Sequence, residues 1–134
     1  MGRTARDLIE ILRAVQANKK SLGQHFLHDE EVLSRTIELA DLISDDQVLE
    51  VGPGPGVLSA RILETGADLV AIEFDPVVCE HLRVTFPHLE LIEADALELE
   101  WPIVNKIVAN IPYQISSPLI EKITRIPAIK TVVI

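Results

Sequence analysis

The sequence predicts an α/β fold in which a parallel sheet is flanked by helices. Short apolar runs of strand type alternate with segments of helical periodicity from residue 47 to the end of the chain. The first run stops at glycines spaced two apart, in the stretch 47–56 (QVLEVGPGPG), and a helical pattern resumes at Val57. A buried strand that ends in a glycine-rich turn and continues as a helix opens a nucleotide-binding unit, so we expect parallel strands with right-handed crossovers.

The composition is that of a globular protein without disulfides. Of the 134 residues, 48% are hydrophobic and 25% are charged, and the formal net charge is −9. This charge argues against the segment alone binding a phosphate backbone, because nonspecific affinity for nucleic acid comes from lysine and arginine. The single cysteine, Cys79, falls in a helical pattern and is interpreted as a small buried hydrophobe. The sequence shows no secretory signal and no apolar run of membrane-spanning length, so the cytoplasm is the expected compartment.

Two helices are predicted before the glycine-rich turn. Residues Thr4–Gln16 form an amphipathic pattern with the apolar side chains on one face. A basic link follows at 18–21 (NKKS). Asp29 is expected to cap a second helix that runs through Ile43.

Beyond the turn, strands and helices alternate with recognisable end signals. The first strand ends at Val51, and Gly66 is placed to cap the C-terminus of the next helix. Asp75 and Pro76 are a capping residue and a first helical residue. The further elements predicted are strands at Leu69–Glu73, Leu89–Glu93 and Lys106–Ala109, a helix at Leu119–Thr124 that Ser117-Pro118 opens and caps, and a fifth strand at Ile129–Ile134. Because the chain stops inside that apolar strand, we expect it to be part of a longer protein.

The glycine-rich turn narrows the class of ligand. The dinucleotide fingerprint started at Gly52 requires a glycine where Val57 stands, and no Walker lysine follows. Pro53 and Pro55 remove two backbone N–H groups from the turn. A phosphate cradle depends on such donors, whereas a turn with close approach and few donors suits a nucleoside without phosphates, such as S-adenosylmethionine. The alternative is an ordinary strand-to-helix turn.

In open parallel sheets the ligand binds beyond the carboxyl ends of the strands. The residues that stand at these ends here are Gly52, Glu73, Asp95 and Asn110. A carboxylate at Glu73, about twenty residues past the turn, can accept both hydroxyls of a ribose. Asp95 can accept a hydrogen bond from an adenine amino group. The alternatives are a solvated acid at Glu73, and Glu93 or Glu98 in the place of Asp95.

The fourth predicted strand ends in Asn110-Ile111-Pro112-Tyr113, which resembles the Asn-Pro-Pro-Tyr-type motif of methyltransferases that act on exocyclic amines. An adenine amine is a poor nucleophile because its lone pair is delocalised into the ring. The amide oxygen of Asn110 and a neighbouring backbone carbonyl, restrained by Pro112, can accept both amine hydrogens and favour a pyramidal nitrogen for in-line transfer. Tyr113 offers a ring on which a flipped-out base can stack. The alternative is a proline-containing turn with a half-buried tyrosine.

The chain closely resembles the small-subunit ribosomal RNA adenine dimethyltransferases, in an archaeal or eukaryotic-like form. The stretches that carry the resemblance, in order, are SLGQHFL (21–27), EVGPGPG (50–56), AIEFDP (71–76), EADALEL (93–99) and NIPYQISSP (110–118). The resemblance implies a Rossmann-like class I S-adenosylmethionine-dependent methyltransferase fold, truncated within the fifth strand. It implies methylation of two adjacent adenosines near the 3′ end of the small-subunit RNA, with small-subunit rRNA or the pre-ribosomal small subunit as partner.

The resemblance also implies site residues, with 110–113 as the catalytic loop. The cofactor contacts that it implies are His25, Leu27, Gly52, Gly54, Glu73, Asp95 and Asn110. His25 stands where bacterial relatives carry asparagine, and a structural histidine is the alternative there. A plain apolar role is the alternative for Leu27. No metal is expected, because no carboxylate or cysteine pattern completes a site around His25 and His28.

The resemblance divides the chain into an N-terminal helix with a cofactor-covering segment, 1–28, and a partial methyltransferase domain, 29–134. The rest of the sheet and a C-terminal helical domain that helps hold RNA are expected to be missing. We therefore predict cofactor binding with weak or absent activity on RNA.

Three other functions stay open. They are the large-subunit rRNA adenine methylase class behind macrolide resistance, a non-catalytic RNA- or DNA-binding relative, and a NAD-dependent oxidoreductase. SLGQHFL favours the small-subunit branch over the first. The intact Asn110 and Tyr113 count against the second, and Val57 disfavours the third.

Overall fold

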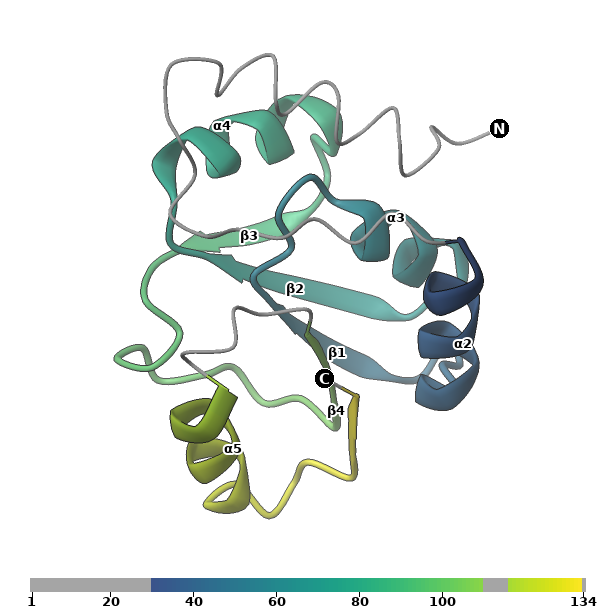
Figure 1. Cartoon of the computed structure of the whole chain (residues 1–134), viewed down its shortest axis with the longest axis vertical. Coiled ribbons are helices and arrows are strands. Elements are labelled where there is room, and N and C mark those ends of the chain that lie inside the picture. The colour runs from purple at the N-terminus through teal and green to yellow at the C-terminus, as the bar shows by residue number, and fades with distance from the viewer. Residues whose placement is uncertain (1–29, 110–115, 134) are drawn as a thin grey trace.

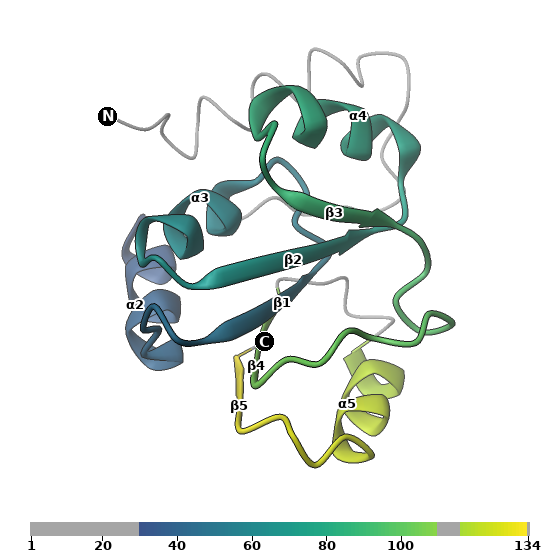
Figure 2. The same cartoon turned by 180° about the vertical axis from the view of Figure 1, so that it is seen from behind.

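The computed structural model describes residues 30–109 and 116–133, and it confirms the parallel α/β sheet. Five strands lie in the order β3-β2-β1-β4-β5, and every neighbouring pair is parallel (Figures 1 and 2). The elements in chain order are α2 (Glu30–Ala40), β1 (Gln47–Val51), α3 (Val57–Glu64), β2 (Asp68–Glu73), α4 (Pro76–Thr85), β3 (Glu90–Glu93), β4 (Lys106–Ala109), α5 (Ser116–Thr124) and β5 (Thr131–Val133). The strand order reverses between β1 and β4, and such a switch point is where ligands bind in these sheets.

β1 lies at the centre of the sheet, as its apolar sequence requires. Val48, Leu49 and Val51 are almost completely buried, because helices and loops cover both faces of a parallel sheet. Alternate side chains point to opposite faces. Val48 joins the apolar cluster with α2 and α3, whereas Leu49 and Val51 join the cluster with α5. The edge strands β3 and β5 are only partly buried.

Helices α2, α3 and α4 lie on one side of the sheet, and α5 lies on the other (Figures 1 and 2). On the first side, Leu33 of α2, Ile62 of α3 and Leu82 of α4 are completely buried. On the second side, Leu119 of α5 is buried in the same cluster as Trp101, which belongs to the long segment between β3 and β4. These layers cover the two faces of the sheet.

Capping signals set two helix ends as the sequence predicts. Asp75 precedes α4, and its Oδ1 accepts a hydrogen bond from the Val77 N–H (2.9 Å). Pro76 is the first residue of that helix. Gly66 follows the end of α3 with a φ of 83°, in the left-handed region that glycine favours.

Two predicted helix boundaries are wrong. α2 ends at Ala40 rather than at Ile43, because Asp41 adopts a left-handed conformation with a φ of 48°. The ammonium of Lys106 binds the carbonyls of Ala40 (3.0 Å) and Asp41 (2.7 Å), which satisfies two acceptors at the helix end. α5 begins one residue before Ser117, so this serine lies in the first turn and does not cap the helix.

A polar cluster ties the end of α2 to the amino ends of β1 and β4. The nearly buried carboxylate of Asp46 accepts hydrogen bonds from the Ile43 N–H (2.8 Å) and the Asn105 amide (2.8 Å). The ammonium of Lys106 lies 2.9 Å from Oδ2, the same oxygen that accepts from the Ile43 N–H. The amide oxygen of Asn105 accepts from the Gln47 N–H (2.8 Å). The Ile43 N–H is the largest cause that lowers the pKa of Asp46, and burial opposes it.

Some predictions lie outside the described residues. These are the helix Thr4–Gln16, the cap Asp29 and the covering role of 1–28. Within 30–109 and 116–133, no helix is long and apolar enough to cross a membrane. In the same residues, no group of three or more histidine, cysteine, aspartate or glutamate side chains could hold a metal ion.

Candidate cofactor site at the carboxyl edge of the sheet

The carboxyl ends of β1, β2 and β3 lie side by side. The Gly52 N–H donates to the Ile72 carbonyl (2.9 Å), so the turn after β1 starts beside the end of β2. The Ala94 N–H donates to the Glu73 carbonyl (3.0 Å), so Asp95 comes directly after the last bond between β2 and β3. The structure thus brings Gly52, Glu73 and Asp95 to one edge.

Several predicted site residues lie outside the described residues, namely His25, Leu27, Asn110, Ile111, Pro112 and Tyr113. The nearest described residue to the predicted catalytic loop is Ala109, which ends β4 and pairs with Val51. Val51 immediately precedes Gly52. β4 therefore ends at the same level of the sheet as β1, across the switch point from the glycine-rich turn.

The turn 52–56 leaves no backbone N–H unused. The Gly52 N–H donates to the Ile72 carbonyl, as described above. The Gly54 N–H donates to Oε1 of Glu73 (3.2 Å), and the Gly56 N–H donates to the Pro53 carbonyl (3.0 Å). The two prolines have no N–H. The three glycines have φ of 68°, 55° and 92°, a region that other residues rarely adopt. The turn offers a close backbone surface and lacks the free donors of a phosphate cradle.

Helix α4 supports this turn from inside the protein. The Nε2 atom of the buried His81 lies 2.9 Å from the Pro55 carbonyl. A Cβ on Gly56 would lie 2.3 Å from Cε2 of Phe86 and 3.3 Å from a methyl carbon of Leu82. Packing as well as backbone conformation therefore requires glycine at position 56. Sequence reasoning missed His81, because its contact joins residues 26 positions apart.

The Glu73 carboxylate is held by three backbone N–H groups at the tip of β2. Its Oε1 accepts from Gly54, and its Oε2 accepts from Phe74 (2.9 Å) and Asp75 (3.1 Å). The residue is only 6% exposed. Burial raises the pKa of Glu73, and the three N–H donors partly offset that rise. Hydroxyl donors from a ribose would further favour the ionised form.

Asp95 begins a tight turn. Its Oδ1 accepts from the Leu97 N–H (2.9 Å), and its carbonyl accepts from the N–H groups three and four residues later (3.1 and 3.0 Å). Its second carboxylate oxygen has no hydrogen bond to any described residue and can accept one from an amine. Of the competing glutamates, Glu93 is engaged with Arg83 (3.1 Å). Asp95 stays the predicted acceptor at this edge.

Sequence reasoning also missed a buried acid beneath the glycine-rich turn. Glu50 of β1 is 1% exposed, and its Oε1 is hydrogen-bonded to the hydroxyl of Ser59 in α3. Burial raises the pKa of Glu50 to about 8, against the Ser59 hydrogen bond and together with the charge of Glu73. Glu50 is therefore mostly protonated at neutral pH. The sequence does carry a signal for this residue, since a glutamate stands inside the apolar run VLEV of a predicted buried strand. Such a buried acid requires a hydrogen-bonding partner.

Phe74 is a further residue at this edge that sequence reasoning did not single out. It directly follows Glu73, and it is 70% exposed. Large aromatic side chains are more often buried, so this ring gives the edge an apolar surface suited to a flat base. The signal is present in the sequence as an aromatic residue just past a predicted strand end.

Cys79 is confirmed as a buried residue. It is completely inaccessible, and its Sγ donates to the Glu73 carbonyl (3.4 Å). Burial raises the pKa of the Cys79 thiol to about 12, so the reactive thiolate is not available at neutral pH.

Comparison with known proteins identifies relatives across most of the chain. The family model for ribosomal RNA adenine dimethylase matches residues 15–134. A probable ribosomal RNA small subunit methyltransferase A of Methanothermobacter thermautotrophicus is 43% identical over an alignment of 113 residues that covers 82% of this chain and 41% of the relative. A dimethyladenosine transferase from Plasmodium falciparum has a TM-score of 0.70 and 34% identity, over 81% of this chain and 42% of its own. The 23S rRNA methyltransferase ErmE has a TM-score of 0.70 and 33% identity, over 81% and 46%.

The equal TM-scores mean that structural likeness alone does not separate the small-subunit from the large-subunit class. The chain spans about two fifths of the length of the curated relatives that it matches. The family model nevertheless covers all but the first 14 residues, from 15 to 134. The chain belongs to the ribosomal RNA adenine dimethylase family.

Proposed function

We propose that the protein carrying this chain transfers methyl groups from S-adenosylmethionine to the exocyclic amines of two adjacent adenosines near the 3′ end of small-subunit rRNA. Family membership and a relative named for the small subunit support this assignment. The observation that carries it is the carboxyl edge, where a turn without free donors meets the anchored carboxylate of Glu73. The partner would be small-subunit rRNA or the pre-ribosomal small subunit, in the cytoplasm.

The residues at this edge fit a sulfonium nucleoside better than a dinucleotide. A pyrophosphate would find no free N–H in the turn 52–56. Glu73 offers acceptors for the ribose hydroxyls, Asp95 offers an acceptor for the adenine amine, and Phe74 offers an apolar surface for the base. The bound cofactor supplies an electrophilic methyl group on a positively charged sulfur. Carboxylate groups nearby favour that charge.

Catalysis in this proposal consists mainly of positioning the acceptor amine. The amide oxygen of Asn110 and a backbone carbonyl next to Pro112 accept the two amine hydrogens, which localises the lone pair on the nitrogen. Tyr113 stacks on the extruded base. These contacts fix the direction of attack, so most of the rate enhancement comes from orientation and electrostatics rather than from a strong base.

We assign the cofactor half of the enzyme to this segment and expect RNA affinity to depend on the remaining length of the protein. The formal net charge of −9 disfavours binding of an RNA backbone by the segment alone. The isolated chain should therefore bind the cofactor and methylate RNA weakly or not at all.

Calorimetry on the chain tests the cofactor class. S-adenosylmethionine or S-adenosylhomocysteine should bind more tightly than NAD, and tighter binding of NAD would reverse the assignment. The substrate is tested by mapping methylated adenosines after incubation of the full-length protein with small ribosomal subunits and with large-subunit RNA. Methylation of the latter alone would favour the macrolide-resistance class. Cofactor binding without any methylation would favour a non-catalytic relative.

The role of Asn110 has its own test in the full-length protein. Asn110→Ala should cut methyl transfer by about a hundredfold or more, because it removes an acceptor that orients the amine in the transition state. Its cofactor affinity should fall far less. Unchanged turnover would remove Asn110 from the mechanism.

A further inference from the structure

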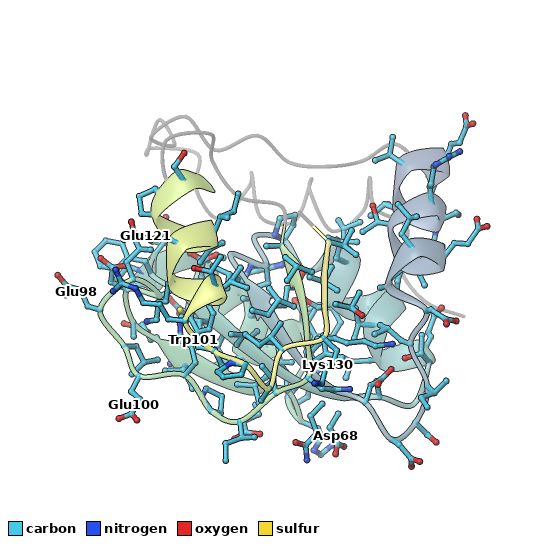
Figure 3. All side chains as sticks on the ribbon, turned by 90° about the horizontal axis from the view of Figure 1, so that it is seen from below. Asp68, Glu98, Glu100, Trp101, Glu121 and Lys130 are labelled. Atoms are coloured by element: carbon cyan, nitrogen blue, oxygen red, sulfur yellow. The ribbon has the colours of Figure 1, made fainter. Side chains whose placement is uncertain are left out.

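A lysine on α5 holds the turn that follows β3. The Nζ of Lys122 donates to the Ala96 carbonyl (2.7 Å) and to the Leu99 carbonyl. It lies 4.6 Å from the centroid of the Trp101 ring. The indole N–H of Trp101 donates to the same Ala96 carbonyl (2.8 Å). Figure 3 shows Trp101 beside α5, so a helix and a loop segment converge on one carbonyl of this turn.

The same turn carries Asp95, the predicted acceptor for the adenine amine. The local hydrogen bonds from Asp95 close the turn 95–99 on itself. Lys122 adds an external attachment, since it binds the carbonyl of Ala96, the next residue after Asp95, and that of Leu99 at the far end. Both ends of the turn are thereby held by a single ammonium.

Helix α5, which carries Lys122, is packed into the core. Leu119 and Ile123 are buried in the cluster on the second side of the sheet, and they flank Lys122 in the sequence. Burial lowers the pKa of Lys122, and the charge of Asp95 opposes that shift. No carboxylate of the described residues forms an ion pair with Lys122. Its ammonium is instead stabilised by two carbonyl oxygens and an aromatic face, which fix where it sits.

We propose that Lys122 is a positioning residue for the adenine end of the cofactor. By holding the turn 95–99 at both ends, it keeps the carboxylate of Asp95 beside the tip of β2, where that carboxylate accepts the adenine amine. The inference rests on the proposed function, because it takes Asp95 as the acceptor for this ligand. Lys122 itself acts through the backbone of the turn and not by contact with the ligand.

Two ligands that differ on the Watson–Crick edge of the purine test this role by calorimetry on the 134-residue chain. They are S-adenosylhomocysteine and its deaminated analogue S-inosylhomocysteine, in which a carbonyl oxygen replaces the amine and N1 carries a hydrogen. Because the N1 change is the same for every variant, the comparison between variants isolates the effect of the substitution. Lys122→Met keeps an apolar stem against Trp101 and removes the ammonium. Its affinity for S-adenosylhomocysteine should fall about tenfold, the effect of one hydrogen bond to a charged acceptor, and its affinity for the analogue by less than about twofold.

Matched variants separate positioning from a general loss of structure. Arg125→Met, at an exposed position directly after the same helix, should leave both affinities unchanged. Lys122→Arg should restore part of the preference for the amine, because a guanidinium can also donate to the carbonyls of the turn. In an Asp95→Asn background, Lys122→Met should cause no further loss of preference.

Equal weakening of both ligands in Lys122→Met, or weakening of neither, would overturn the role of Lys122 and leave the proposed function standing. Failure of the unaltered chain to bind S-adenosylhomocysteine would overturn both. Folding of each variant is followed by circular dichroism, because the emission of Trp101 would respond directly to the loss of the neighbouring ammonium. If Lys122→Met does not fold, Lys122→Gln is measured in its place and must meet the same outcomes.

Discussion

Replacement of Glu50 by glutamine should make the stability of this chain less sensitive to alkaline pH. The carboxyl group of Glu50 is 1% exposed in the central strand, and its hydrogen-bonding partner is the neutral hydroxyl of Ser59. Burial raises its pKa to about 8, and the charge of Glu73 adds to the rise. Glutamine has nearly the same shape and can make the same hydrogen bond, but it cannot ionise. The substitution therefore removes the titration and keeps the packing.

The magnitude follows from proton linkage. The pKa of Glu50 in the folded chain, about 8, lies above the ordinary value of 4.5. The stability that the neutral acid contributes is therefore fully present below about pH 4.5 and is lost as the pH rises toward 8. The loss is about 1.4 kcal/mol for each pH unit in this window, or roughly 3 kcal/mol by pH 7. Glu50→Gln avoids that loss.

Urea unfolding at pH 5 and pH 8, followed by circular dichroism, measures the effect. The free energies of unfolding of the unaltered chain and of Glu50→Gln should be similar at pH 5, and the variant should be the more stable at pH 8. Glu64→Gln, at an exposed position in α3, is the control and should show no such divergence. The reasoning would be refuted if the difference in the free energy of unfolding between Glu50→Gln and the unaltered chain stayed constant from pH 5 to pH 8. A constant difference would mean that Glu50 is ionised in the folded chain throughout this range.

Three further predictions concern the glycine-rich turn, the binding of the cofactor, and the polar cluster around Asp46 at the amino ends of β1 and β4. Gly56→Ala should lower the free energy of unfolding by about 3 kcal/mol or more, because the new methyl group would overlap Phe86. Gly66→Ala is the control: the nearest atom would be 3.7 Å away, so the substitution should cost only about 1 kcal/mol of backbone strain. Equal losses for the two variants in urea unfolding would contradict this account. Glu73→Ala should raise the dissociation constant for S-adenosylmethionine about a hundredfold and Glu73→Gln, which keeps one acceptor oxygen, about tenfold; an unchanged calorimetric constant would mean that this acid serves only the turn. Asp46→Asn should lower the melting temperature at pH 7, because the pKa of Asp46 is lowered in the folded chain. The stability that the carboxylate contributes is present above its ordinary value of 3.8 and is lost as the pH falls through the lowered value, so the two melting curves should converge in acid.

The glycine-rich turn illustrates how the fold selects a ligand by removing donors. Proline eliminates two N–H groups, and the remaining donors of the turn 52–56 are used within the protein. The Gly54 N–H is bound by the carboxylate of Glu73, so the residue proposed to bind the ribose also closes the loop beside it. Binding and loop conformation should therefore be coupled at Glu73.

Most of the secondary structure could be predicted from the sequence, because its determinants act between near neighbours. The alternation of apolar runs and helical periodicity located the strands and helices, and the Asp75-Pro76 cap and the glycine after α3 marked helix ends correctly. The strand-end rule placed Gly52, Glu73 and Asp95 together, since parallel strands direct all their carboxyl ends to one edge. Where a distant residue intervened, local reasoning failed: the ammonium of Lys106 binds the carbonyls that end α2 early.

Only the tertiary structure decided what supports the site. The packing of the helices and loops on the sheet brings together three pairs of partners that are distant in the sequence or in different elements. These are the hydroxyl of Ser59 with Glu50, the ring of Phe86 with Gly56, and the carbonyls of the turn 95–99 with Lys122. A sequence pattern shows that a residue is apolar, acidic or free of a side chain, since these are properties of the residue itself. It does not show which distant atom will lie beside that residue, because that depends on how the helices pack on the sheet. The residue types at the carboxyl edge of the sheet could therefore be predicted from the sequence, whereas the contacts that support these residues were determined by the packing.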